Sequence, residues 1–407
     1  MSVEIRSITA EDAVAFRRAI RHGFHNANVI DDEQFARDMS EPFDRHYVAV
    51  DGPEFVATFG SFPTELTLPG GVTVPAGAVT QVTCRATHRR QGILTRIMER
   101  DLIGSRDRGE VADVLIAAEY PIYGRFGYGP AARGTIRVVE AELATPTYGG
   151  AGTIRVVDAA TFRKDAPAVF DRVRRSRPGM IDRDLFDWDM RSDVRRYPEG
   201  KPWHGFRILC VDDAGTVQGY ARYTVKDDWS DMRPRSTLEV AELASATPAA
   251  EARLWAYLLS LDLIGTIKAP DRPVDDVLPW LLVDARHAKQ TSCFDMLWLR
   301  PLDVARLLTT RAYAASGRVV IEVDDPLGLA GGRFALDASP AGATCTTTTE
   351  SAELTLPIRT LGAACLGDVR LDVLHRAGWL DEHVPDAVAR AGALLAGDVA
   401  PWCNTWF

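Results

Sequence analysis

The strongest indications of chemistry in this chain lie between Val79 and Pro130. The β-rich run Val79–Cys84 precedes the loop Arg89-Arg90-Gln91-Gly92, and that loop opens a segment with apolar residues at helical spacing. Backbone N–H groups at a helix N-terminus, flanked by arginine and glycine, suit a pyrophosphate. The alternative is a plain glycine turn with solvated arginines, since R-x-x-G is common by chance. No Lys-Ser/Thr ending follows, so a nucleoside triphosphate loop is disfavoured.

A second candidate is Tyr123, in the run IYGRFGYGP just after the expected strand Val114–Ala117. A phenol has an unperturbed pKa of about 10, so it stays protonated at neutral pH and suits a general acid for a departing thiolate. Tyr128 is the competing tyrosine, and spacing alone favours packing roles for both. Cys84 adjoins the loop, but a strand cysteine without a His/Asn arrangement predicts a small buried hydrophobe and no catalytic role.

Two further groups of residues could take part in chemistry. The acidic cluster Asp31-Asp32-Glu33 would attract a polyamine if it faced a cleft, although a solvated helix N-terminus is the simpler interpretation. His22, His25 and His88 could each act as a base, and no pattern singles one out.

Composition narrows the class of protein. The chain has 407 residues, a formal net charge of −9 and a pI near 5.5, which disfavours nucleic-acid binding. We expect no signal peptide and no membrane span, because neither a basic-apolar leader nor a long apolar run occurs. The six cysteines form no C-x-x-C pair. This pattern predicts reduced thiols in the cytoplasm and no metal site.

The elements that must position these residues fall into three blocks, 1–135, 136–290 and 291–407. In the first block we expect a helix over Ala10–His22 and strands over Tyr47–Val50 and Phe55–Phe59. The strand–loop–helix unit follows, and then a strand and a tight turn. This order, and the blocks that follow it, predict an α+β (mixed α/β) fold.

The second block repeats this order. A helix over Ala166–Arg175 precedes strands over Arg207–Val211, Val217–Val225 and Leu238–Ala244, and a helix over Ala249–Leu261. Its strand–helix junction reads ELASATPAAEARLW, with neither an arginine pair nor a glycine. The block therefore predicts a second copy of the fold without the phosphate loop.

The third block mixes strands with a helical tail. We expect strands over Arg318–Val323 and Arg333–Ala338, another β pair over Thr344–Thr349 and Ala352–Pro357, and helices from Leu361 onward before an extended PWCNTWF.

With these residues in hand, the chain resembles the Eis (enhanced intracellular survival) family of aminoglycoside acetyltransferases, within the Gcn5-related N-acetyltransferase (GNAT) superfamily. The resemblance spans the whole chain and is most specific in HRRQGILTRIM (His88–Met98) and AAEYPIYGRFGYGPA (Ala117–Ala131). It implies two tandem GNAT-like domains. Residues 1–135 would bind acetyl-CoA, and residues 136–290 would lack the phosphate loop. A sterol-carrier-protein-like domain, 291–407, would follow, in a cytoplasmic homo-oligomer, a hexamer in the family.

The resemblance also implies site roles, with acetyl-CoA as donor and a polyamine-type small molecule as acceptor. Tyr123 matches the general acid, and the terminal carboxylate, here on Phe407, would be the base. The implied acetyl-CoA contacts are the backbone of Val82, Thr83 and Cys84, the loop and helix start Arg89, Arg90, Gln91, Gly92, Ile93, Leu94 and Thr95, and the bordering Ala118 and Glu119.

Three departures from the wider superfamily concern the cofactor and the acceptor. Leu94 stands where Gly or Ala is common, Ala118 replaces a frequent Ser, and Tyr120-Pro121 replaces a smaller pair beside the acceptor. Lysine or polyamine acetylation on the same fold therefore stays an alternative, as does a non-catalytic acyl-CoA or lipid-binding module. A Rossmann enzyme is disfavoured because no G-x-G-x-x-G follows an early strand.

Overall fold

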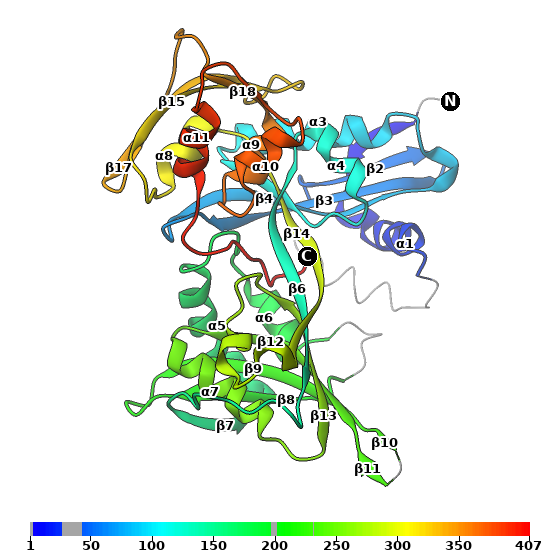
Figure 1. Cartoon of the computed structure of the whole chain (residues 1–407). Helices are drawn as coiled ribbons and strands as arrows, with labels where there is room; N and C mark the ends of the chain where they lie inside the picture. Colours follow the sequence, from blue (N-terminus) through cyan, green and yellow to red (C-terminus); the bar gives the residue numbers. More distant parts are fainter. Residues whose placement is uncertain (1–2, 27–42, 197–201, 231) are drawn as a thin grey trace.

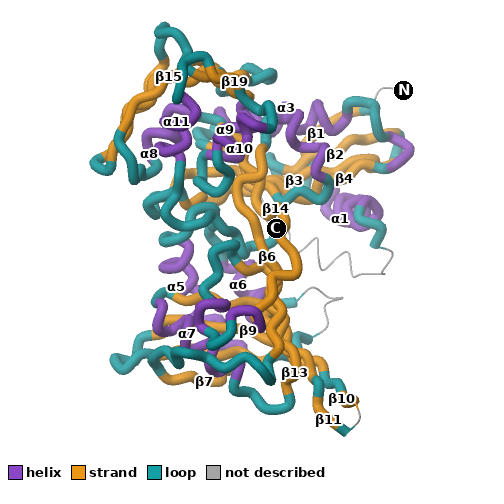
Figure 2. The backbone as a smooth tube through the Cα atoms, in the orientation of Figure 1, coloured by secondary structure: helices purple, strands orange, loops and turns teal. Residues whose placement is uncertain are grey.

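A computed structural model of the chain describes residues 3–26, 43–196, 202–230 and 232–407. In these residues strands and helices mix throughout, and the predicted α+β class is confirmed (Figures 1 and 2). A long sheet runs through the first two blocks, and a smaller sheet belongs to the third. In the part of the chain that is described, no helix has the length and apolar character needed to cross a membrane.

The first block contains the predicted helix, meander and strand–loop–helix unit. The expected helix over Ala10–His22 is a short 3-10 turn followed by α1, which buries Phe16 and Ile20. Strand β5 ends at Leu115 rather than the predicted Ala117, because its pairing with β4 stops there. The elements are β1 (Glu4–Ser7), α1 (Ala13–Gly23), β2 (His46–Asp51), β3 (Glu54–Thr67), β4 (Thr73–Cys84), α3 (Ile93–Asp107), β5 (Ala112–Leu115), α4 (Tyr120–Tyr123) and β6 (Gly129–Glu140).

The second block repeats this element order. Helix α5 begins earlier than the predicted Ala166, because the Asp158 side chain accepts the Thr161 N–H at 2.8 Å and caps the helix. The elements are β7 (Thr153–Val157), α5 (Ala159–Arg174), α6 (Leu185–Ser192), β8 (Phe206–Val211), β9 (Val217–Lys226), the pair β10 (Trp229–Ser230) and β11 (Arg233–Pro234), β12 (Ser236–Ser245), α7 (Pro248–Leu259), β13 (Ile264–Arg272) and β14 (Ala288–Pro301). The predicted boundary at 290/291 lies within β14.

One sheet joins the two blocks. Among the described residues its order is β1-β2-β3-β4-β5-β14-β6-β13-β12-β9-β8-β7. Strand β14 pairs with β6 along most of its length, with β5 at one end, and β6 pairs with β13 at the other. The two long strands thus cross between the halves, and Figure 1 shows them as the connection between the upper and lower parts.

The third block packs a smaller sheet against helices. Its elements are α8 (Val304–Thr310), β15 (Gly317–Asp324), β16 (Gly332–Ser339), β17 (Gly342–Thr347), β18 (Leu354–Pro357), α9 (Ile358–Ala364), α10 (Leu371–Arg376), β19 (Asp381–Glu382) and α11 (Ala387–Leu395). The predicted pairing of Thr344–Thr349 with Ala352–Pro357 is wrong. Strand β17 pairs with β16, whereas β18 runs parallel to β15, because the sheet order is β17-β16-β15-β18-β19.

The third block shares a core with the first. Leu66 of β3 and Leu299 of β14 belong to the same buried cluster as Ile358 and Leu361 of α9. After α11 the chain is extended, as predicted, and runs back between the two halves of the long sheet (Figure 1). The last residues therefore touch both halves: Trp402 belongs to a core cluster of the second block, and Cys403 to the cluster that the first and third blocks share.

Candidate active site

The parallel strands β4 and β5 separate to form an opening, here called the first wedge. They pair only between Ala76–Val79 and Ala112–Leu115. Beyond Val79, β4 continues to Cys84, and in the described part of the chain its partner there is β3. The predicted contacts Val82, Thr83 and Cys84 therefore lie on a strand edge that β5 has left. An extended ligand can pair with such an edge.

A β-bulge shapes β4 at the start of this wedge. The register between β3 and β4 shifts between Thr58 and Gly60, and Gln81 has a positive φ of 56°. The Thr58 hydroxyl donates to the Gln81 carbonyl at 2.7 Å and lies 2.7 Å from the Thr83 hydroxyl. These contacts fix the bulge, which re-aims the following backbone groups of β4.

The predicted phosphate loop lies at the mouth of the first wedge. Arg90 and Gly92 have positive φ values of 64° and 71°, so successive N–H groups can converge as in an anion-binding nest. Helix α3 begins after Gly92 with no side-chain cap. A Cβ at Gly92 would meet no atom within 4 Å, so glycine is favoured there by backbone conformation and not by space.

The remaining residues of the loop and helix start have distinct exposures. The predicted phosphate contacts Arg89, Arg90, Gln91 and Gly92 are exposed, whereas Ile93 is buried in the core under the helix, and Leu94 and Thr95 are half-buried. The N-terminal end of α3 therefore presents its uncapped N–H groups together with two arginines to solvent. Such an end attracts an anion through its free donors and the helix dipole.

Tyr123 lies beyond the end of β5, after the exposed Ala118 and Glu119. Its side chain is only 7% exposed, and burial, together with the nearby Glu119 carboxylate, raises its pKa to about 12. Tyr128 contacts the Tyr123 ring edge-on at 6.2 Å, but it is fully buried and its hydroxyl donates to Asp113 at 3.4 Å. Of the two tyrosines, Tyr123 is the one with a partly accessible side chain.

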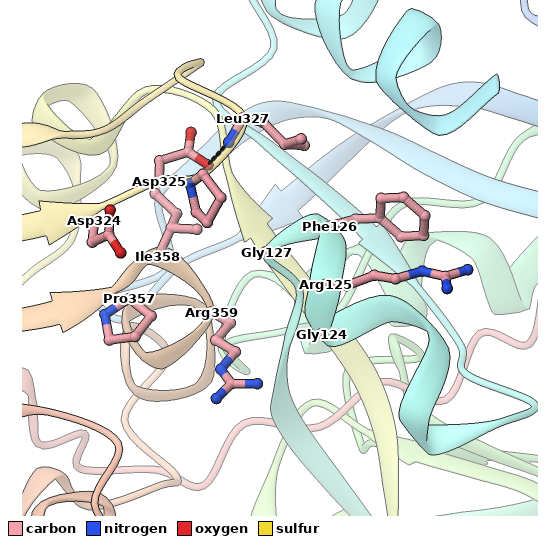
Figure 3. A pocket seen from close by; sticks show the side chains of 11 residues that line it. Gly124, Arg125, Phe126, Gly127, Asp324, Asp325, Leu327, Pro357, Ile358 and Arg359 are labelled. Carbon is pink, nitrogen blue, oxygen red and sulfur yellow. Dashed lines mark hydrogen bonds between the residues drawn. The ribbon is translucent and has the colours of Figure 1, made fainter. Parts of the chain in front are cut away.

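The turn after Tyr123 rests on the third block. A cavity of about 280 Å³ lies between Gly124–Gly127 on one side and Asp324–Leu327 and Pro357–Arg359 on the other (Figure 3). Beside it, Arg300 of β14 pairs with Asp325 at 2.8 Å, and both side chains are fully buried. The same carboxylate accepts the Leu327 N–H at 3.3 Å, drawn as a dashed line in Figure 3. This pair fixes the loop against which the Tyr123 turn packs.

The other sequence candidates have different surroundings. Burial raises the pKa of the Cys84 thiol, which disfavours the nucleophilic thiolate form. His88 lies 3.1 Å from the Asp51 carboxylate at the surface of the loop. The acidic cluster Asp31-Asp32-Glu33 lies outside the described residues.

Phe407 returns to the first block from the far end of the sequence. Its ring packs edge-on against Phe62 of β3, with centroids 5.6 Å apart. Phe62 pairs with Ala78 of β4, next to Val79, where the first wedge begins. Phe407 therefore packs on β3, the strand next to the one that carries the predicted acetyl-CoA contacts Val82, Thr83 and Cys84.

Sequence reasoning missed a second set of residues with unusual surroundings. Arg183 and Glu242 form a buried ion pair at 2.7 Å in the second block, and Arg183 also contacts Asn404 and Thr405. The three segments are far apart in sequence and none carries a motif. The signal in the sequence was the aromatic tail with Trp402, Trp406 and Phe407, whose composition favours a packed terminus but does not identify its partners.

Three parts of the chain match models of known protein families. Residues 4–131 and residues 179–307 each match the Acetyltransferase (GNAT) domain. Residues 304–404 match the Sterol carrier protein domain.

Several relatives match over most or all of the chain. An uncharacterized N-acetyltransferase of Streptomyces avermitilis is 40% identical over 100% of this chain and 99% of its own. The N-acetyltransferase Eis of Mycobacterium tuberculosis is 33% identical over 86% of this chain and 85% of its own. The crystal structure of Eis1 from Mycobacterium abscessus, 29% identical, matches with a TM-score of 0.88 over 99% of this chain and 100% of that one.

Proposed function

The chain belongs to the Eis family of GNAT N-acetyltransferases and is an acetyl-CoA-dependent N-acetyltransferase; from this premise we propose that it acetylates amines of polycationic small molecules, aminoglycosides in particular, at one or more positions. The observation that carries the proposal is the first wedge, which joins a free strand edge, an uncapped helix start and a buried tyrosine. The formal charge of −9 favours a cationic acceptor by long-range attraction.

The residues of the first wedge suit acetyl-CoA. The backbone of Val82, Thr83 and Cys84 would pair with the pantetheine arm as an added strand would. Residues 89–95 would hold the pyrophosphate through N–H groups and two arginines, with Ala118 and Glu119 at the border. The bound donor supplies an acetyl group on a thioester.

The protein's own groups would then transfer protons and stabilise the charge that develops during the reaction. The acceptor amine arrives as a cation, and the Phe407 carboxylate would remove its proton directly or through water. The free amine would attack the thioester carbonyl to form the C–N bond, and a backbone N–H of the bulged strand β4 would stabilise negative charge on the thioester oxygen. As the C–S bond breaks, Tyr123 would donate its phenolic proton to the departing sulfur, and the second proton that the nitrogen loses would restore it. The raised pKa of Tyr123 keeps it protonated for this role at neutral pH.

The acceptor class is tested by steady-state release of CoA thiol from acetyl-CoA. The panel contains kanamycin-like aminoglycosides, spermidine and a lysine peptide at equal concentration. We expect kcat/KM to be highest with aminoglycosides. Preference for spermidine or the peptide would contradict the acceptor assignment, and no release with any amine despite acetyl-CoA binding would overturn the proposed reaction.

We further propose that the protein works in the cytoplasm as a homo-oligomer, a hexamer as the family resemblance implies. The three-block division at 135 and 290 likewise stays a proposal. Light scattering coupled to size exclusion gives the mass of the assembly. A monomer at micromolar concentration would contradict the oligomer.

A further inference from the structure

The C-terminal segment 400–405 is held by the second block. Residues 401–405 are buried, and Trp402 belongs to the same core cluster as α5, α6 and β12. The Trp402 N–H donates to the Pro178 carbonyl at 2.9 Å. Trp406 is 69% exposed, and Phe407 then packs on the first block (Figure 1). The segment thus bridges the two acetyltransferase domains.

Arg183 makes the polar contacts that fix the end of this segment. Its Nη2 donates to the Asn404 carbonyl at 2.9 Å and its Nε donates to the Thr405 hydroxyl at 3.0 Å. Its Nη1 donates to Glu242 at 2.7 Å. The guanidinium also lies 3.9 Å above the Phe170 ring, so the planar group is held on its face as well as at its edges.

Glu242 in turn holds Arg183. The same carboxylate oxygen accepts from the Tyr220 hydroxyl at 2.7 Å and from the Asn404 amide at 3.4 Å. Burial alone would raise the pKa of Glu242, but Arg183, with Arg191 and Arg222, lowers it to about 2, so the cluster is charged at neutral pH. A buried ion pair adds little stability over apolar packing, whereas it can specify geometry.

This cluster lies where two parallel strands of the second block stop pairing. Parallel pairing between β12 and β13 stops at Glu239, and a bulge follows at Ala241, so β12 and β13 form a second wedge. Arg272 of β13 reaches across it and donates to the Leu243 carbonyl at 3.1 Å. Its guanidinium also lies 5.8 Å from the Trp402 ring. The second wedge is therefore bridged by an arginine and bordered by the C-terminal segment.

We propose that Arg183, held by Glu242, is a positioning residue for acetyl transfer in the first wedge. By fixing Asn404 and Thr405, it sets where Phe407 and its carboxylate lie against β3. The inference rests on the proposed function, in which that carboxylate is the base. In the proposed site acetyl-CoA does not contact Arg183 or the residues that it holds. Loss of the Arg183 contacts should therefore lower kcat and leave the KM for acetyl-CoA unchanged.

A double-mutant cycle on the full chain tests this inference. One change is Arg183→Lys, which keeps the positive charge but loses the planar guanidinium with its several N–H donors. The other is a Gly-Ser extension after Phe407, which moves the terminal carboxylate. We expect Arg183→Lys to lower kcat about 10- to 100-fold, since a displacement of ~1 Å can cost about 10²-fold, with KM for acetyl-CoA within about twofold. In the extended chain, Arg183→Lys should have no further effect on kcat.

Two outcomes separate this inference from the proposed function. If Arg183→Lys lowers kcat by the same factor in both chains, the residue does not act through the carboxylate and the inference is overturned alone. If the extension leaves kcat unchanged, the carboxylate is not the base, and this inference fails together with that assignment, whereas release of CoA with an amine still supports the proposed reaction.

Two further variants guard against a general folding defect. Arg311→Lys is the matched control, because Arg311 is also a buried arginine that donates to backbone carbonyls, those of Cys365 and Leu395. It should lower thermal stability and leave kcat unchanged. Thr405→Val removes one hydrogen bond. It should lower kcat about 3- to 10-fold in the chain that ends at Phe407 and have no effect in the extended chain. An equal loss of kcat in Arg311→Lys and Arg183→Lys would overturn the proposal.

Discussion

In the first domain the parallel pairing of β4 and β5 stops at Val79, and in the second that of β12 and β13 stops at Glu239. A bulge follows in each case, at Gln81 and at Ala241. Among the residues that the structure describes, β4 pairs with β3 alone from Val82 onward, so the first wedge is open there. The second is bridged by Arg272, whose guanidinium donates to the carbonyl of Leu243.

The N-termini of the helices at the two wedges also differ, in their caps and in their charges. Helix α3 begins after Gly92 without a side-chain cap, next to two exposed arginines. Helix α7 begins after Thr247, whose hydroxyl accepts the Ala250 N–H at 3.2 Å, and its first turn carries Glu251, which pairs with Arg272. A helix start that has a side-chain cap and carries a carboxylate disfavours a pyrophosphate. The same fold therefore gives one wedge that suits the proposed anion and one that borders the chain terminus.

The largest effect is expected at Tyr123, a residue of the first domain. We expect Tyr123→Phe to lower kcat about 10²- to 10⁴-fold, the usual contribution of a general acid, with acetyl-CoA affinity nearly unchanged. Tyr128→Phe is the control, since Tyr128 is fully buried against Asp113. Stopped-flow or steady-state CoA release measures kcat, and calorimetry measures affinity. Activity of Tyr123→Phe equal to that of the parent would remove Tyr123 from the mechanism.

The next effect concerns the anion site of the first domain. Replacing either Arg89 or Arg90 with alanine should raise the Kd for acetyl-CoA about 10- to 100-fold, because one charge-assisted hydrogen bond contributes ~1.5–3 kcal/mol. Arg106→Ala, at the other end of α3 beside Asp107, is the control. Calorimetry should also give one acetyl-CoA per chain. Two sites per chain would contradict the bridged second wedge.

A smaller effect is expected at the helix start of the second domain. Thr247→Ala should lower the free energy of unfolding by about 0.5–2 kcal/mol, because α7 loses its N-cap. It should leave both kcat and the Kd for acetyl-CoA unchanged. Urea denaturation measures the first quantity. A change in acetyl-CoA affinity would mean that the second wedge takes part in binding.

The smallest effect is a pH dependence. A general acid works while protonated, so activity that depends on Tyr123 is present below its pKa and lost above it. With a pKa of about 12, kcat should fall by less than about a tenth between pH 8 and pH 10, whereas a tyrosine of ordinary pKa, about 10, would lose half. A kcat profile in overlapping buffers checks this. Half-loss at pH 10 that is absent in Tyr123→Phe would contradict the raised pKa.

Much of the first wedge could be predicted from local sequence. Strand, loop and helix follow one another between Val79 and Asp107, and the glycine and arginines that favour an anion lie within one turn. The ends of strands could not be predicted as well. The choice of Leu115 as the end of β5 depends on pairing with β4, and the partners of β17 and β18 depend on the whole sheet.

Local sequence patterns were enough to predict the family and the mixed α/β class, and to propose a phosphate loop that the second block lacks, because each depends on residues close together in the chain. Only the tertiary structure decided that the terminal segment lies across the second domain, that Arg183 and Glu242 hold it, and that Arg272 bridges the second wedge. Those contacts join residues separated by tens to hundreds of positions, and no local pattern encodes which distant partner a buried charge will meet.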